Sequence, residues 1–236
     1  MAQKKLLRFA QIKEFPHVLE YPQDMKGQWK QFFKNDQPLI LELACGRGEY
    51  TLGLAAMFPA KNFIGVDVKG NRMYLGAKKV LESNLTNAAF LRTQIEMIDH
   101  YFAPGEVDEI WITFPDPQLR TSKAKKRLTH PRFLRLYNQF LKPGGSIHLK
   151  TDSPDLHVFT GKVIDMYGLS LLEESGNVYA APHKAELDIK THYESLDIAQ
   201  SKKIHYLRFT LPVSLPDLDD ALMENLKQTE NQHEQA

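Results

Sequence analysis

Apolar segments of strand length alternate along this chain with longer segments in which apolar residues recur at helical spacing. This alternation predicts strands that are each followed by a helix. The predicted strands cover residues 39–43, 62–67, 88–91, 107–114, 146–151, 169–172 and 204–211. The predicted helices cover residues 50–56, 70–83, 131–141, 153–167 and 191–201. Repeated strand–helix units favour an α/β fold with a mostly parallel sheet, helices on both faces and a ligand beyond the carboxyl ends of the strands.

The segment 44–49 between the first strand and the first helix is a glycine-containing turn, Ala-Cys-Gly-Arg-Gly-Glu. Gly46 and Gly48 tolerate left-handed or crowded backbone conformations, so a ligand can approach the main chain where free helix N–H groups face outward. Asp67 ends the second strand near the spacing at which a carboxylate reaches a ribose hydroxyl in dinucleotide-binding folds. Thr51 stands where the nicotinamide fingerprint has its third glycine. The turn therefore indicates a nucleotide-type site, although two glycines also occur in turns that bind nothing.

The 236 residues include 42% hydrophobic ones, enough for one good core, and the formal net charge is only +1. A nearly neutral chain has no global field for a polyanion, so a contact with nucleic acid must come from local clusters of charge. Cys45 is the single cysteine, which excludes an intramolecular disulfide and a cysteine cluster for zinc, and favours the cytoplasm. We expect no metal site, and no apolar run approaches membrane-spanning length.

Composition divides the chain into three parts. Residues 1–37 hold basic residues and aromatic residues around Trp29, and predict a basic arm followed by a short helix that packs against the core. Residues 38–211 contain the alternating strands and helices and form the main domain. Residues 212–236 are rich in Asp, Glu and Gln, and predict a frayed helix or a disordered tail.

A carboxylate and a basic cluster follow the strongest predicted strand, residues 107–114. Asp116 lies between two prolines and should emerge at the carboxyl edge of the sheet, beside the glycine turn; the alternative is an aspartate that only closes a turn. The basic residues that follow are Arg120, Lys123, Lys125, Lys126, Arg127, Arg132 and Arg135. A run of charge is usually a solvated face, but after a catalytic loop it favours contacts with nucleic-acid phosphates.

Six segments carry a more specific signal when they are taken in order. They are Glu42 to Gly48, the strand end at Asp67, Phe114-Pro115-Asp116-Pro117, Lys126-Arg127-Leu128, Leu149-Lys150-Thr151-Asp152, and Thr191-His192-Tyr193-Glu194. This set resembles the bacterial tRNA (guanine-N7-)-methyltransferase family over roughly residues 38–211. That family belongs to the class I methyltransferases, which depend on S-adenosylmethionine.

The resemblance implies a Rossmann-like class I methyltransferase fold, with a mostly parallel seven-stranded sheet and an antiparallel last strand. It implies methyl transfer to N7 of guanine 46 in the variable loop of tRNA. The implied cofactor-binding residues are Glu42, Gly46, Gly48, Asp67, Gln94 and Asp116, and Asp116 is also the expected catalytic residue. The implied tRNA-binding residues are Arg120, Asp152, Thr191, His192, Tyr193 and Glu194. We expect tRNA as the partner and no association with a membrane. The expected assembly is a monomer or a homodimer.

Two positions depart from the family pattern. Gln94 stands where the family usually has Asp, and Gln118-Leu119-Arg120 follows Pro117 where the family has Trp-Pro-Lys. Some residues also have structural alternatives: Asp152 could be a helix-entry residue, and Thr191 with Glu194 fits a helix capping box. Three alternative functions remain: a small-molecule methyltransferase of the same fold, a nicotinamide dehydrogenase and a non-catalytic tRNA-binding protein. The first has no use for the basic cluster.

Overall fold

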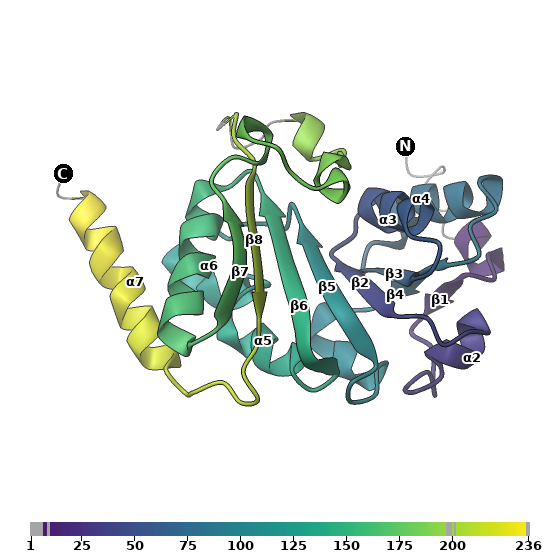
Figure 1. Ribbon diagram of the computed structural model, residues 1–236, viewed down its shortest axis with the longest axis horizontal. Coiled ribbons are helices and arrows are strands. Elements are labelled where there is room, and N and C mark those ends of the chain that lie inside the picture. Colours follow the sequence, from purple (N-terminus) through teal and green to yellow (C-terminus); the bar gives the residue numbers. More distant parts are fainter. Residues whose placement is uncertain (1–6, 9, 197–199, 201, 235–236) are drawn as a thin grey trace.

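The computed structural model describes residues 7–8, 10–196, 200 and 202–234, and an eight-stranded sheet runs through the molecule (Figure 1). The strands are β1 (Val18–Glu20), β2 (Leu39–Leu43), β3 (Asn62–Asp67), β4 (Ala88–Arg92), β5 (Val107–Thr113), β6 (Leu141–Thr151), β7 (Ser170–Ser175) and β8 (His205–Thr210). The α-helices labelled in Figure 1 are α2 (Trp29–Phe33), α3 (Glu49–Met57), α4 (Gly70–Glu82), α5 (Pro131–Tyr137), α6 (Pro154–Tyr167) and α7 (Asp219–Glu234).

The order of the strands across the sheet is β1-β4-β3-β2-β5-β6-β8-β7. All neighbours from β1 to β6 pair in parallel, whereas β8 runs antiparallel to both β6 and β7. The predicted fold class is therefore confirmed, including the antiparallel last strand. The sheet has one strand more than the predicted seven, because β1 adds to the edge at β4. The parallel pairing brings the carboxyl ends of β2, β3, β5 and β6 to one edge.

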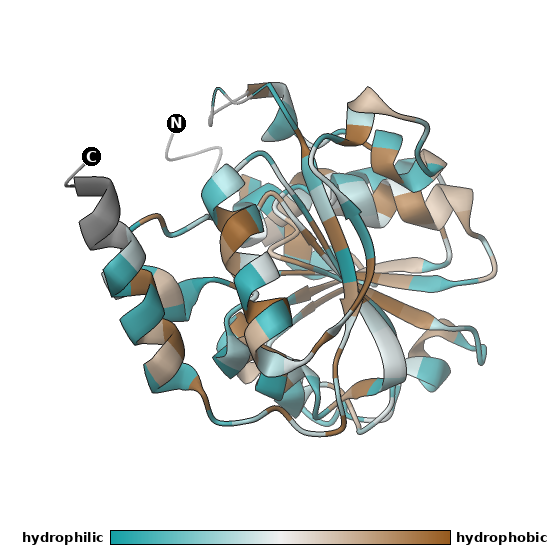
Figure 2. Ribbon diagram, turned by 60° about the vertical axis from the view of Figure 1, so that its left-hand side comes forward, coloured by the Kyte–Doolittle hydropathy of each residue, from teal (hydrophilic) through white to brown (hydrophobic). Residues whose placement is uncertain are grey.

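The core lies on both faces of the sheet, because neighbouring residues in a strand point to opposite faces. Ile40 of β2 packs with α3 and α4, and the next residue, Leu41, packs with α5 and α6. Figure 1 shows α3 and α4 beside β2 to β4, and α6 and α7 at the other end near β7 and β8. In Figure 2 hydrophobic residues follow the central strands, while the outer helices mix hydrophobic and hydrophilic positions.

The segments at both ends of the chain are tied to this core. Trp29 of α2 is buried, stacks on Phe102 at 5.3 Å and donates a hydrogen bond to the carbonyl of Tyr101 at 2.8 Å. Helix α7 lies against α6, where Tyr167 donates to Asp219 at 2.7 Å. Leu222 of α7 is fully buried. No helix among the described residues is long and apolar enough to cross a membrane.

The predicted boundaries differ from the structure in two instructive places. Helix α5 ends at Tyr137, and the expected turn at 142–145 lies inside β6 as an irregularity, with the register shifting from Val107↔Leu141 to Glu109↔Ser146. The proline and the left-handed Gly144 (φ 77°) in this segment cannot continue a regular ladder. The predicted helix 191–201 was wrong over its first residues, which form a turn and a short 3₁₀ helix, Glu194–Leu196; residues 197–199 and 201 lie outside the described residues.

Candidate active site

Two adjoining cavities lie at the carboxyl edge of the sheet. The smaller has a volume of about 240 Å³ and the larger about 640 Å³. Both are lined by Ala44, Asp67, Pro115 and Asp116, so the two cavities meet at the two carboxylates. Gln94, which the resemblance places on the cofactor side, lines the smaller cavity. The structure thus brings together three of the predicted cofactor residues, which come from the ends of three different strands.

The glycine turn orients Asp67. The backbone N–H of Gly46 donates to Asp67 Oδ2 at 2.9 Å, and the N–H of Lys69 donates to Oδ1 at 2.8 Å. An ionised carboxylate has about four acceptor positions, so Asp67 can still accept from hydroxyl groups in the cavities. Gly48 has a left-handed φ of 72°, and a Cβ there would lie 2.4 Å from the ring of Phe90. The turn therefore needs glycine at 48 both for its conformation and for its packing on β4.

Glu42 supports this turn from within the protein. Its Oε2 accepts hydrogen bonds from the N–H and the hydroxyl of Thr51 at 2.7 and 2.6 Å, and its Oε1 accepts from the Thr113 hydroxyl at 3.0 Å. Burial raises the pKa of Glu42 to about 7, and the three hydrogen bonds oppose that rise. Glu42 lines neither of the two cavities, so its visible role is to join β2, α3 and β5. Thr51, which stands in place of the third glycine, is a partner of this carboxylate.

Asp116 lies on a loop with a constrained backbone. Phe114 has a left-handed φ of 48°, and its N–H donates to the carbonyl of Lys150 at 2.9 Å. Asp116 is exposed, lines both cavities and accepts from the N–H of Gln118 at 3.0 Å through Oδ1. The turn-closing alternative is therefore realised, in a side chain that also lines both cavities.

Arg127 is not part of a phosphate-binding surface, which corrects the prediction from the basic cluster. Its side chain is 4% exposed and donates to the carbonyls of Pro117, Gln118 and Leu119 at 3.0–3.2 Å. Its guanidinium also lies 4.4 Å from the ring centre of Phe159. Arg127 thus clamps the loop that carries Asp116. A sequence pattern of charge cannot distinguish such a clamp from a solvated cation.

Arg135 is also engaged within the fold: it donates to both carboxylate oxygens of Asp219 at 2.8 and 3.0 Å. The remaining members of the cluster are exposed, and we call them the basic strip: Arg120, Lys123, Lys125, Lys126 and Arg132. Lys126 also lines the smaller cavity, whereas Arg120 lines neither. The strip therefore begins at the mouth of the site and runs along η3 (Thr121–Lys126).

The larger cavity has a second wall that comes from the end of β6 and from the segment after β7. Asp152 and Tyr193 line the cavity on this wall. The cations Lys69 and Arg72, at the start of α4, also line the cavity. The Tyr193 ring lies over the glycine turn, since a Cβ built on Gly46 would meet its Cε2 at 3.5 Å. The Arg72 guanidinium lies 5.4 Å from the centre of the same ring.

The other predicted tRNA-side residues do not line the cavity. Thr191 is buried and accepts from the N–H of Glu194 at 3.1 Å through its hydroxyl, which is one half of the capping box. The Glu194 carboxylate instead accepts from Lys150 Nζ at 3.0 Å. The carbonyl of His192 accepts from the Ser195 hydroxyl at 2.6 Å. These three residues shape the segment that presents Tyr193.

Known proteins are similar to this chain over most of its length. The model of a family described as methyltransferases matches residues 36–207. A tRNA (guanine-N(7)-)-methyltransferase of Bacteroides fragilis is 49% identical over 222 residues, which cover 90% of this chain and 87% of the relative. The chain belongs to the tRNA (guanine-N(7)-)-methyltransferase family. The enzyme of that name from Christiangramia forsetii is 43% identical over 89% of this chain and 99% of its own length.

Solved structures agree in fold at much lower identity. The 16S rRNA methyltransferase KamB superposes with a TM-score of 0.60 at 15% identity, over 79% of this chain and 94% of that chain. A 30S ribosomal A1408 methyltransferase from an uncultured bacterium superposes with a TM-score of 0.56 at 17% identity, over 79% of this chain and 93% of that chain. At this identity the likeness establishes the class I methyltransferase fold of this family member, and no more.

Three residues at or near the site were not among the predicted site residues. Lys150 and Arg72 stand in ordinary strand and helix patterns. Only the fold shows that Lys150 donates to Glu194 and that Arg72 lines the larger cavity beside Tyr193. Gly76 had a weak signal as a glycine inside a helix: a Cβ there would lie 2.3 Å from the carbonyl of Arg47 in the glycine turn. Among the described residues no group of three or more His, Cys, Asp or Glu could hold a metal ion, and the absence of a metal stays a prediction.

Proposed function

We propose that this chain transfers the methyl group of S-adenosylmethionine to N7 of guanine 46 in the variable loop of tRNA. The observation that carries the proposal is the meeting of two cavities at Asp67 and Asp116, in a chain whose relatives are tRNA (guanine-N(7)-)-methyltransferases. Two ligands that react with each other need adjoining sites with a shared boundary. Such a substrate also fits the predicted cytoplasmic location.

The smaller cavity suits the adenosine part of the methyl donor. Asp67 offers carboxylate oxygens for ribose hydroxyls, and the Gln94 amide oxygen can accept from an adenine amino group. Bound there, S-adenosylmethionine supplies an electrophilic methyl group on a sulfonium. The backbone of the glycine turn, with its left-handed Gly46 and Gly48, lets a ligand approach closely. These residues therefore offer hydrogen-bond acceptors and a close backbone approach that fit the adenosine part of S-adenosylmethionine.

The larger cavity suits a single nucleotide, since its volume lies in the usual range for ligand sites. Guanine N7 has a lone pair and no proton, so the enzyme needs no general base. Catalysis then depends on alignment and on a carboxylate that offsets the positive charge growing on the purine. We assign that role to Asp116 and the holding of the base to Tyr193 and Asp152, which line the cavity. N7 lies in the deep groove of an RNA helix, so the base must come from a loop or be displaced.

The basic strip supports tRNA rather than a small molecule as the methyl acceptor. Five exposed cations continue from the mouth of the site in a chain of net charge +1. Phosphates along one stretch of RNA would contact such a strip and fix the register of the tRNA, while the cavity selects the base. Arg120 stands within this strip, where the family usually has Lys.

The test is incubation of the protein with labelled S-adenosylmethionine and unmodified tRNA, followed by mapping of the methylated base. We expect label at N7 of guanine 46, and none in a tRNA in which that base is adenine. Label in small metabolites would favour the small-molecule alternative. Binding of tRNA without any label would favour the non-catalytic alternative.

A further inference from the structure

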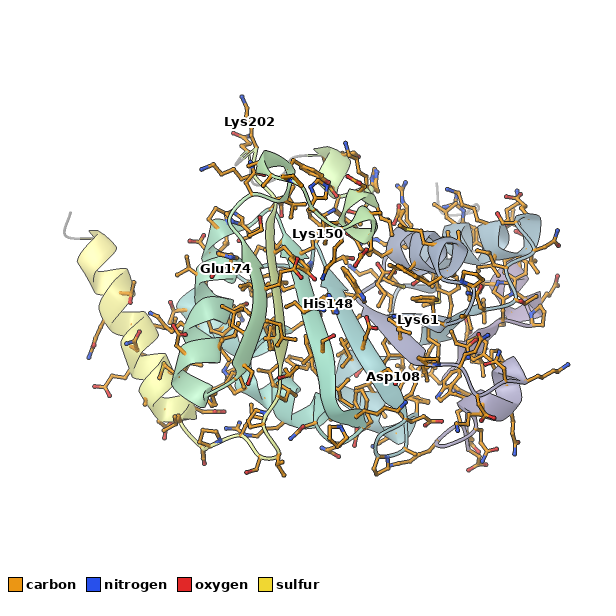
Figure 3. The ribbon with its side chains drawn as sticks, in the orientation of Figure 1. Lys61, Asp108, His148, Lys150, Glu174 and Lys202 are labelled. Atoms are coloured by element: carbon orange, nitrogen blue, oxygen red, sulfur yellow. The ribbon has the colours of Figure 1, made fainter. Side chains whose placement is uncertain are left out.

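Lys150 is a fully buried lysine at the carboxyl end of β6 (Figure 3). Its ammonium donates to the carbonyls of Leu187 at 2.8 Å and Ile189 at 3.1 Å, and to the Glu194 carboxylate at 3.0 Å. The Tyr179 hydroxyl lies 3.3 Å away and itself donates to Glu194. All of these partners belong to the segment after β7. One side chain of the sheet therefore holds residues 179–194 at four points.

Lys150 touches both walls of the larger cavity. Its main-chain carbonyl accepts from Phe114 at 2.9 Å and so fixes the start of the loop that carries Asp116. Its side chain fixes the segment that carries Tyr193, and two residues further along the chain Asp152 lines the cavity itself. A shift of Lys150 would thus move both walls relative to each other.

Packing alone does not require a lysine at this position. Burial lowers the pKa of Lys150, and the nearby Glu194 opposes that change. Glu194 is itself only 7% exposed, so both charges have lost most of their hydration. Apolar residues of similar size can replace a buried ion pair with little loss of stability, but they do not impose the direction of a charged hydrogen bond. The pair therefore supplies position rather than stability.

We propose that the Lys150–Glu194 pair is a positioning latch that holds Tyr193 over the glycine turn and completes the wall for the methyl acceptor. This inference rests on the proposed function, because it concerns the guanine side of the reaction. Lys150 acts through the segment and does not touch the reacting atoms. The smaller cavity, which contains Gln94, has no residue of this segment in its lining.

The test compares Lys150→Met, Glu194→Gln and the double variant with the wild type. Lys61→Met is the matched control. Lys61 forms an ion pair with Glu109, with 2.7 Å between Nζ and Oε1, and neither residue lines either cavity. Each variant is measured for kcat/KM with tRNA, for affinity toward S-adenosylhomocysteine, for thermal stability, and for hydrogen exchange of residues 187–196 in the free protein. The exchange measurement does not depend on activity, so it distinguishes a failed latch from a failed assignment of function.

We expect Lys150→Met to lower kcat/KM with tRNA about thirtyfold, as for a lost charged hydrogen bond, with S-adenosylhomocysteine affinity changed by less than about threefold. Exchange in 187–196 should rise. The double variant should regain thermal stability, because no unpaired charge stays buried, yet keep the low kcat/KM. The proposal is wrong if the double variant regains activity together with stability. It is also wrong if hydrogen exchange of residues 187–196 does not change in Lys150→Met. Should Lys150→Met fail to fold, Glu194→Gln decides by the same criteria.

Discussion

The larger cavity has two walls, and each is built around a buried glutamate. The hydrogen-bond donors that surround these two glutamates differ in charge. Glu42, under the glycine turn, is bound by uncharged donors from Thr51 and Thr113. Glu194, on the far wall, accepts from the ammonium of Lys150 as well as from the Tyr179 hydroxyl. The first wall uses backbone and hydroxyl groups of elements that pack directly on one another. The second wall is a segment without long helices or strands, and one charged pair locates it. The comparison shows that one site can combine two kinds of wall. One wall is positioned by the packing of strands and helices, and the other is positioned by an ion pair between two side chains.

The largest expected effect comes from Asp116, which stands where the two cavities meet. Asp116→Ala should lower methyl transfer about a hundredfold or more, the usual loss for a group that stabilises transition-state charge. Affinity for S-adenosylhomocysteine should stay nearly unchanged. Single-turnover kinetics with saturating tRNA measure the effect. Asp165→Ala on the exposed side of α6 is the control. Turnover equal to that of the wild type would remove Asp116 from the mechanism.

The first wall could be predicted from the sequence pattern itself, whereas only the family resemblance pointed to Asp152 and Tyr193 of the second wall. A strand, a glycine turn and a strand-end aspartate are adjacent in the chain, and parallel strands bring their ends together. Asp67, Gln94 and Asp116 accordingly line the cavities as expected. Lys150 and Glu194 are 44 residues apart, and their pairing depends on how the segment after β7 folds back. Neither residue type nor spacing encodes that return path.

The same distinction applies to single side chains. Glu42 as a cofactor-binding residue stays a prediction: its carboxylate accepts from Thr51 and Thr113, and a position within a strand does not reveal the partners of a buried carboxylate. Arg127 was expected to bind phosphate, but it is buried among loop carbonyls. The central strands followed the pattern closely, because their continuous apolar runs must be buried on both faces of the sheet. Strand β1 has three half-buried residues and no apolar run, so it left no signal.

The uncharged surroundings of Glu42 predict an unusual pH dependence of stability. Burial raises its pKa from the ordinary value of about 4.5 to about 7, so the folded state binds a proton more tightly than the unfolded chain. The contribution of Glu42 to the free energy of unfolding is complete below about pH 4.5. It should be lost as the pH rises to about 7, with a total loss of about 3 kcal/mol. Urea unfolding across this range should therefore show a flatter profile for Glu42→Gln than for the wild type. Buried histidines titrate in both proteins, so the difference between the profiles isolates Glu42.

The backbone contacts of the first wall can be tested with a pair of helical glycines. A Cβ on Gly76 would lie 2.3 Å from the carbonyl of Arg47, so Gly76→Ala should displace the glycine turn and destabilise the protein by about 2 kcal/mol. Affinity for S-adenosylhomocysteine should fall as well. A Cβ on Gly161 of α6 meets no described atom within 4 Å, so Gly161→Ala should stabilise the protein by about 0.5 kcal/mol. Equal effects of the two substitutions, in calorimetry and in titration, would show that the turn tolerates displacement.

The smallest effect should come from the basic strip, which lies outside both walls. Replacement of Lys123, Lys125 and Lys126 by Gln removes three exposed charges without touching the clamp at Arg127. The slope of log Kd for tRNA against log salt should become shallower by about two, because fewer counterions are released from the RNA. The maximal rate at saturating tRNA should stay that of the wild type, since neither wall moves. Replacement of the same lysines by Arg should retain the slope, because charge rather than shape attracts phosphate. A lowered maximal rate in the Gln variant alone would mean that the strip also shapes the site, as Lys126 borders the smaller cavity.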